Sequence, residues 1–308
     1  MNALSTPSLA TPIGLRLQKA SQAGLCPSTL SPAQPVQEDF SLNRWLEAMR
    51  LSGLASLMTR SSSVHLLIPS DAAFDALLLD MKLGWADLCS DLPRLRALML
   101  GHVLMEGQNP AWASPGSLIR CANGQALKLE ARGVLRDAQG ASARLLRAMP
   151  TNAGPKAHLI DRVLRPAEQN LLDLLAQAPE FSLFNAALHT SGLQHWLAGS
   201  GPFTLLAPCN AGWSLIEQQL GLSAEALLSG PSELLRHLVG RHLFVGKWLS
   251  DELPWGGRLV ACNGDSVNLS ALGLIGEGSW AQALSQDCNQ QTRDGVLHRL
   301  QHPLLSYH

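Results

Sequence analysis

The chain has 308 residues and a nearly balanced charge, with 23 lysine and arginine residues against 24 aspartate and glutamate residues. At roughly 100–200 residues per domain, this length predicts about two domains. The balanced charge lacks the basic excess of a dedicated nucleic-acid binder, and no apolar stretch approaches the ~18 residues of a transmembrane helix. With 46% hydrophobic and 15% charged residues, the composition favours a globular protein over a disordered one.

Residues 1–36 differ from the rest of the chain. They contain no acidic residue, only Arg16 and Lys19 as bases, and many Ser, Thr, Pro and Ala residues. Polar residues and prolines interrupt each apolar run, so this segment has no recognisable secretory signal peptide. We expect a flexible tail, with a transit peptide or an atypical export signal as alternatives; the sequence alone favours the cytoplasm and leaves the compartment open.

An internal repeat with a period of about 140 residues organises the remainder. Residues 66–72 (LLIPSDA) return as residues 205–211 (LLAPCNA). The same spacing relates the other shared positions, which are Asn123-Gly124 and Asn263-Gly264, His102 and His242, and His158 and His298. The sequence therefore predicts two copies of one domain, at residues 37–166 and 167–308.

Each copy begins with helical signals. In the first copy, Ser41 is placed to cap a helix, Gly53 to end it in the left-handed conformation, and residues 64–68 to form a short strand that stops at Pro69. Asp71 is then expected to cap a second helix. The second copy repeats these signals at Ser182, Gly192 and Asn210.

The later part of each copy is predicted to be β-structure. An apolar helical run (residues 92–99 and 234–239) leads to hairpins around Asn123-Gly124 and Asn263-Gly264, for which we expect type I′ turns. Closing strands follow at residues 157–164 and 295–300. Because helices precede strands within each copy, the expected fold class is α+β.

These motifs together resemble the fasciclin-like domain family. The resemblance lies in residues 66–74 (LLIPSDAAF) and 205–213 (LLAPCNAGW), in the two Asn-Gly hairpins, and in the closing segments. It implies two tandem fasciclin-like domains, each a wedge-shaped β-sandwich flanked by short helices. It also implies a protein that is usually extracellular or at the cell surface and serves adhesion or partner binding without catalysis.

Two histidines and two tryptophans are the candidate binding residues. Gly101 and Arg241 replace the tyrosine of the family's Tyr-His element, which is linked to adhesion in animal members, whereas His102 and His242 remain. A hydrogen-bonded core role is the alternative for these histidines. Trp248 and Trp255 bracket a polar loop, where exposed aromatic side chains often anchor a partner; packing of the loop is the alternative.

No residue set predicts catalysis or a metal site. The six cysteines lack zinc-ligand spacing, and no nucleophile elbow or phosphate-binding loop is present. Cys209, at a helix start, leaves a redox role as an alternative to a structural one. We therefore expect no enzyme and no cofactor, but a protein that binds a protein or glycan partner; the alternative is a carrier of an apolar small molecule such as a carotenoid or lipid.

Overall fold

A computed structural model of the chain describes most of the sequence after the first 39 residues. One compact unit, Phe40–His308, contains both repeats from Phe40 onward. The expected N-terminal tail, residues 1–36, lies outside the described residues. The described ranges are 40–60, 64–105, 107–110, 113–149, 155–230, 232–276, 281–285 and 288–305.

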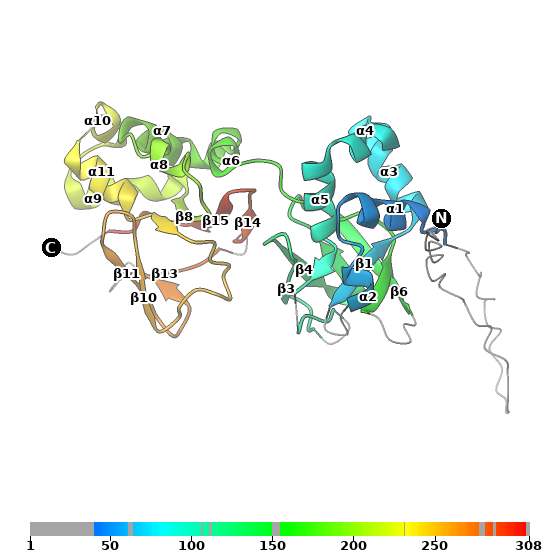
Figure 1. The fold of residues 1–308 in the computed structure, drawn as a ribbon. Coiled ribbons are helices and arrows are strands. Elements are labelled where there is room, and N and C mark those ends of the chain that lie inside the picture. Colours follow the sequence, from blue (N-terminus) through cyan, green and yellow to red (C-terminus); the bar gives the residue numbers. More distant parts are fainter. Residues whose placement is uncertain are drawn as a thin grey trace, which may run out of the picture. The chain divides into compact units, whose positions relative to one another are not determined.

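In the first repeat, the longer helices gather on one side of the strands, whereas the short α2 lies beside β1 (Figure 1). The helices are α1 Asn43–Leu51, α2 Leu57–Arg60, α3 Asp71–Met81, α4 Trp85–Ser90 and α5 Leu92–Leu100, with the short 3-10 helix η1 Ala131–Gly133. The strands are β1 His65–Pro69, β2 Val103–Leu104, β3 Leu118–Arg120, β4 Ala126–Glu130, β5 Val134–Arg136, β6 Ser142–Met149 and β7 Lys156–Ile160.

The seven strands of the first repeat form one continuous sheet in the order β2-β1-β7-β6-β5-β4-β3. A bridge between Leu104 and Cys121 joins the two ends of this order. Apolar side chains from the strands at both ends of this order, and from the strands between them, form one buried cluster inside the fold. The sheet thus closes on itself as a small sandwich with its own core.

Strand β1 is buried on both faces. Leu66 and Ile68 belong to the cluster shared with the helices, whereas Leu67 between them belongs to the cluster inside the sandwich. This division follows from the two-residue alternation of side chains along a strand. β1 pairs in parallel with β7, so the first strand of the repeat lies beside the last one.

The second repeat has the same plan. Its helices are α6 Leu171–Gln177, α7 Ser182–Thr190, α8 Gln194–Leu197, α9 Ser214–Leu220, α10 Ala224–Leu228 and α11 Glu233–Gly240, with the 3-10 helices η2 Pro179–Phe181 and η3 Asn210–Trp213. Its strands are β8 Phe203–Pro208, β9 Leu243–Val245, β10 Gly257–Val260, β11 Ser266–Leu269, β12 Leu274–Ile275, β13 Gln282–Ala283, β14 Gln290–Gln291 and β15 Gly295–Leu300.

These strands form two four-stranded sheets, β10-β11-β12-β13 and β14-β15-β8-β9. The Cys262 N–H donates to the Leu243 carbonyl and so connects them (2.8 Å). β8 pairs in parallel with β15, and its Leu205 and Leu206 belong to the helix-side core and the sandwich core respectively. The expected α+β class is confirmed. The expected boundary between residues 166 and 167 falls between β7 and α6.

The expected helix caps were partly wrong. The Ser70 hydroxyl, not Asp71, caps α3 by accepting from the Ala73 N–H (3.3 Å). The Asp71 carboxylate instead accepts from the N–H groups of Asn43 and Arg44 at the start of α1, and the Ser41 hydroxyl donates to it (2.6 Å). The first helix is therefore capped by a residue that lies beyond the strand that follows it.

In the second repeat, too, a residue beyond the first strand caps the helix that precedes this strand, but with a different side chain. Asn210 Oδ1 accepts from the Leu183 N–H at the start of α7 (3.0 Å). Cys209, which occupies the position of Ser70, makes no side-chain cap. The segment that it precedes begins as the 3-10 helix η3 instead of as a regular α-helix.

The expected type I′ hairpin turns were also wrong. Gly124 is left-handed (φ 77°), but Asn123 is not among the described non-glycine residues with positive φ. The Gly124 N–H donates to the Cys121 carbonyl (3.0 Å), while the Cys121 N–H donates to the Gln125 carbonyl (2.7 Å). This is a three-residue loop that ends in a left-handed glycine, and the loop at Gly264 has the same hydrogen bonds.

Gly295 gives a test of the parallel strand pair. A Cβ atom at this position would overlap the carbonyl oxygen of Phe203, its partner on β8. We expect Gly295→Ala to destabilise the second repeat by roughly 1–3 kcal/mol through overpacking, as measured by urea unfolding. The control is Gly230→Ala, because the space around Gly230 is open; equal stability of the two variants would contradict the close approach of β8 and β15.

Candidate functional site: the histidines and the tryptophan loop of the repeats

The histidines of the Tyr-His element lie in the core. His102 is 0% and His242 1% exposed. The His102 Nδ1 bonds the Leu98 carbonyl (2.9 Å), and its Nε2 accepts from the Leu164 N–H (3.0 Å). His242 bonds the Leu238 carbonyl and the Leu304 N–H in the same way, each at 2.9 Å. Each imidazole thus joins the helix before it to the segment after the closing strand.

This hydrogen bonding requires a neutral ring, because one nitrogen accepts a hydrogen bond from a backbone N–H. Burial lowers the pKa of both His102 and His242 to about 4, which agrees with that requirement. Neither side chain reaches the surface of its repeat. A contribution to binding would therefore act through the segments that the two histidines hold in place.

His298 supports the loop at residues 249–254, which Trp248 and Trp255 bracket and which we call the tryptophan loop. Its Nε2 bonds the carbonyl oxygen of Trp248 (2.7 Å), and burial lowers its pKa to about 4. In the first repeat the equivalent His158 bonds another imidazole instead, with 2.6 Å between His158 Nδ1 and His65 Nε2. The sequence shows that His158 and His298 are shared by the two repeats, but it gave no sign that one of them fixes this loop.

The two loop tryptophans are half-buried and pack against the sandwich core of the second repeat. The Trp248 indole N–H donates to the Val245 carbonyl (2.9 Å). The Trp255 indole N–H donates to the Ser250 carbonyl (2.8 Å). The polar edges of both indoles are therefore used within the loop, and the uncovered parts of the rings are what a partner could contact.

The loop between them is held in one conformation. Leu249 and Leu253 are buried (2% and 4% exposed), and the Glu252 carboxylate accepts from the Leu249 N–H (3.0 Å). The Asn289 side chain accepts from the Ser250 N–H (2.8 Å). A loop fixed in this way loses little conformational entropy when it binds a partner.

A groove of about 820 Å³ lies next to Trp255 along the chain and is open to solvent. Glycines and short side chains from the start of β10 and the turn after β11 line much of it. Its lining includes Gly256, Gly257, Arg258, Asn268 and Ser270. They offer accessible backbone, one cation and polar groups, which suits a polar partner better than an apolar molecule.

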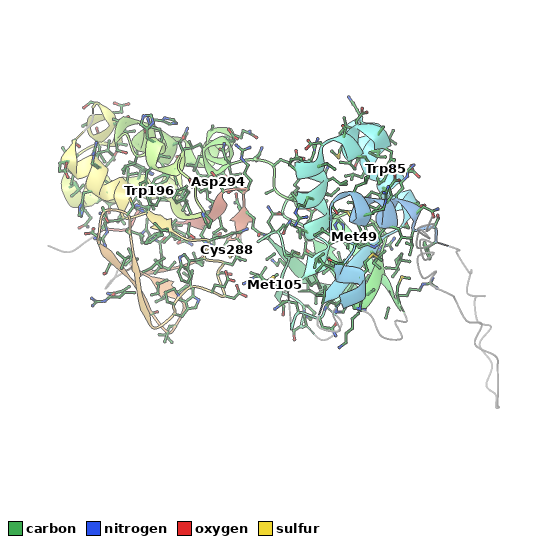
Figure 2. The ribbon with its side chains drawn as sticks, in the orientation of Figure 1. Met49, Trp85, Met105, Trp196, Cys288 and Asp294 are labelled. Carbon is green, nitrogen blue, oxygen red and sulfur yellow. The ribbon has the colours of Figure 1, made fainter. Side chains whose placement is uncertain are left out.

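Four further tryptophans lie in or against the helix-side cores. Trp45 and Trp213 are buried, at 0% and 2% exposed. Trp196 lies on the helical side of the second repeat and packs against Phe203, with 4.6 Å between ring centroids (Figure 2). In the first repeat, Trp85 makes an edge contact with Phe74 at 5.5 Å. These rings serve packing, so the loop holds the candidate aromatic anchor.

Within the described ranges, no group of three or more His, Cys, Asp or Glu side chains is placed to hold a metal ion. The five cysteines in those ranges are unpaired. The Cys209 thiol is buried and donates to the Gln301 carbonyl (3.2 Å). Burial raises the pKa of Cys121 to about 12 and that of Cys262 to about 11, which keeps both thiols protonated at neutral pH.

None of the described helices combines the length and the apolar character that crossing a membrane requires.

Comparison with known proteins supports the resemblance seen in the motifs. The family model of the Fasciclin domain matches residues 179–306, which lie in the second repeat, and the resemblance is confirmed. The transforming growth factor-beta-induced protein ig-h3 of Sus scrofa is 30% identical over 144 residues, which are 43% of this chain and 20% of that protein. Stabilin-1 of Homo sapiens is 26% identical over 273 residues, which are 84% of this chain and 10% of that protein.

The chain therefore spans only a tenth to a fifth of the length of these relatives. Among solved structures, a FAS1 domain pair from the insect cell adhesion molecule fasciclin I aligns with 87% of this chain and 98% of its own. The identity is 18% and the TM-score 0.39.

The buried histidines predict a specific dependence of stability on pH. His102, His242 and His298 have a folded pKa of about 4, below the ordinary value of 6.5. As the pH falls, the unfolded chain binds protons before the folded one. The contribution of these histidines to the free energy of unfolding is therefore complete above pH 6.5. It is lost as the pH falls from 6.5 to about 4, by up to ~1.4 kcal/mol per pH unit for each histidine. Urea unfolding between pH 7.5 and 4.5 measures this slope.

The variant His242→Ala measures the contribution of one histidine to this pH dependence. It leaves the Leu238 carbonyl and the Leu304 N–H without their partner, so we expect a loss of about 2–4 kcal/mol at pH 7.5 and a shallower slope below pH 6.5. The control is His195→Ala, because His195 is exposed. An unchanged slope in His242→Ala would contradict the neutral, buried state of this imidazole.

Proposed function

We propose that this chain is a non-enzymatic binding protein of the adhesion type, whose second repeat presents Trp255 and the adjoining groove to a protein partner. The fasciclin resemblance implies such a function. The observation that carries the choice of surface is the fixed loop, which ends at the half-buried Trp255. Gly256 and Gly257, directly after Trp255 in the chain, line the groove.

In this proposal the four candidate residues have different roles. Trp255 contacts the partner directly, together with Arg258 from the groove, since aromatic and arginine side chains supply most of the energy at many interfaces. Trp248 contributes by holding the loop, because its backbone and its indole are both hydrogen bonded inside the repeat. His102 and His242 are positioning residues.

An apolar carrier has less support. Its basis is the apolar composition, but the buried side chains of each sandwich pack against one another as a core. The groove beside Trp255 has polar groups in its lining. We therefore place the carotenoid or lipid carrier second, and coloured or lipid-loaded protein purified from the native host would reverse this order.

Retention of chain-coated beads on host cells tests the proposed surface. We expect Trp255→Ala and Arg258→Ala each to reduce retention about tenfold, which corresponds to ~1.4 kcal/mol. Arg50→Ala is the control, because it removes the same charge from an exposed position on α1. Retention should be lost when the cells are treated with protease; loss only after removal of glycans would indicate a glycan partner.

Unfolding of each variant is measured alongside, because Trp255 also packs in the loop. Normal retention of both folded variants would contradict the proposed surface. A loss shared by Arg50→Ala would show that the effect depends on net charge and not on the groove.

We further propose that binding takes place at the cell surface or outside the cell, as the family resemblance implies. Fractionation of host cells should then recover the chain outside the cytoplasm, with a new N-terminus before Glu38 if an atypical export signal is removed. Recovery of the intact chain in the cytoplasm would contradict this location.

A further inference from the structure

The tip of the β3–β4 hairpin of the first repeat contacts the second repeat through a pair of ion pairs. Arg120 Nε lies 2.8 Å from Glu252 Oε1, and Arg120 Nη2 lies 2.6 Å from Asp251 Oδ1. The Arg120 side chain is 18% exposed, against 52% and 40% for the two carboxylates. One guanidinium thus bonds two carboxylates of the same loop, and an arginine that uses two of its donors in this way is held in a defined orientation.

The backbone of the hairpin is bonded as well. β5 pairs with β4 only from Lys128 onward, so the sheet leaves one side of Ala126 without a partner strand. The Gln291 side chain takes that place: its Oε1 accepts from the Ala126 N–H (2.8 Å), and its Nε2 donates to the Ala126 carbonyl (2.7 Å). The amide of one repeat therefore continues the sheet of the other.

A third group of contacts excludes water from the same place. Ala126, Leu249 and Val296 are buried together, at 1%, 2% and 0% exposed, and Leu118 packs against them. The Lys247 ammonium group donates to the Gly124 carbonyl at the hairpin turn (2.9 Å). Charged, polar and apolar contacts thus converge on residues 118–126.

We propose that the hairpin tip at residues 120–126 is an intramolecular docking site for the second repeat, held by Arg120, and that it makes the two repeats one coupled unit. The partner of this site is the loop at residues 247–252 together with Gln291. The contact uses the Asp251 end of the loop, and so leaves the Trp255 end available.

The equivalent hairpin of the second repeat lacks this chemistry. The strand registers pair Arg120 with Ala126 in the first repeat and Val260 with Ser266 in the second. Val260 is 62% exposed and has no charge with which to bond a pair of carboxylates. The docking contact is therefore specific to the first hairpin, and the same ion pairs cannot be made by the second one.

Charge reversal with rescue tests the proposal on the full chain, with small-angle X-ray scattering as the readout. We expect Arg120→Glu to raise the radius of gyration and broaden the pair-distance distribution. The triple variant Arg120→Glu, Asp251→Arg and Glu252→Arg should restore the wild-type curve. The radius of gyration of the wild-type protein should also rise in 1 M NaCl, as it does in Arg120→Glu, because salt screens exposed ion pairs.

Arg136→Glu is the matched control. Arg136 pairs with Glu130 within the first repeat (2.7 Å), so its reversal disturbs an ion pair of the same sheet without touching the contact. If Arg120→Glu fails to fold, Asp251→Arg gives the same test from a half-exposed side chain. A wild-type scattering curve for folded Arg120→Glu or Asp251→Arg would overturn the proposal, and so would an equal change in Arg136→Glu.

Discussion

The parallel pairing of the first strand of each repeat with its last strand is the constraint on which the rest of the structure depends. β1 pairs with β7, and β8 with β15, across more than half of each repeat. Joining such distant segments carries an entropic cost, which burial on both strand faces offsets: Leu66 faces the helices and Leu67 the sandwich interior. Strands buried on both faces read as continuous apolar runs, and this explains the LLIP and LLAP sequences.

The buried histidines add a second connection between the same two layers. His102 and His242 each bond a helix carbonyl and the N–H of a residue beyond the closing strand. Their recurrence therefore follows from the architecture of the repeat, whatever the repeat binds. Gly101 and Arg241, which precede these histidines, are buried as well. In such a fold, a histidine shared by both copies is a weak sign of a binding site.

Local sequence signals predicted the helices and strands. The features that these signals did not predict depend on tertiary contacts. The glycines after α1 and α7 and the prolines that end β1 and β8 marked element ends correctly, since each acts through its own backbone. The cap of α1 by Asp71 depends on a strand that brings the two together. The pairing of Arg120 with Asp251 joins residues 131 positions apart, and neither residue carries a local signal for it. The loop was identifiable from its tryptophans, but its anchoring by His298 was not.

The two repeats use one scaffold with different side-chain contacts at equivalent positions. Arg241 bonds Asp265 at the second hairpin (2.9 Å). In the first repeat these positions hold Gly101 and Gln125, and the Gln125 side chain instead accepts from the Ala167 N–H between the repeats (3.1 Å). One hairpin is thus fixed by an ion pair within its own repeat, whereas the other contacts the neighbouring repeat. The internal repeat thus carries two specialised halves, and comparison of matched positions separates what maintains the fold from what each half contacts.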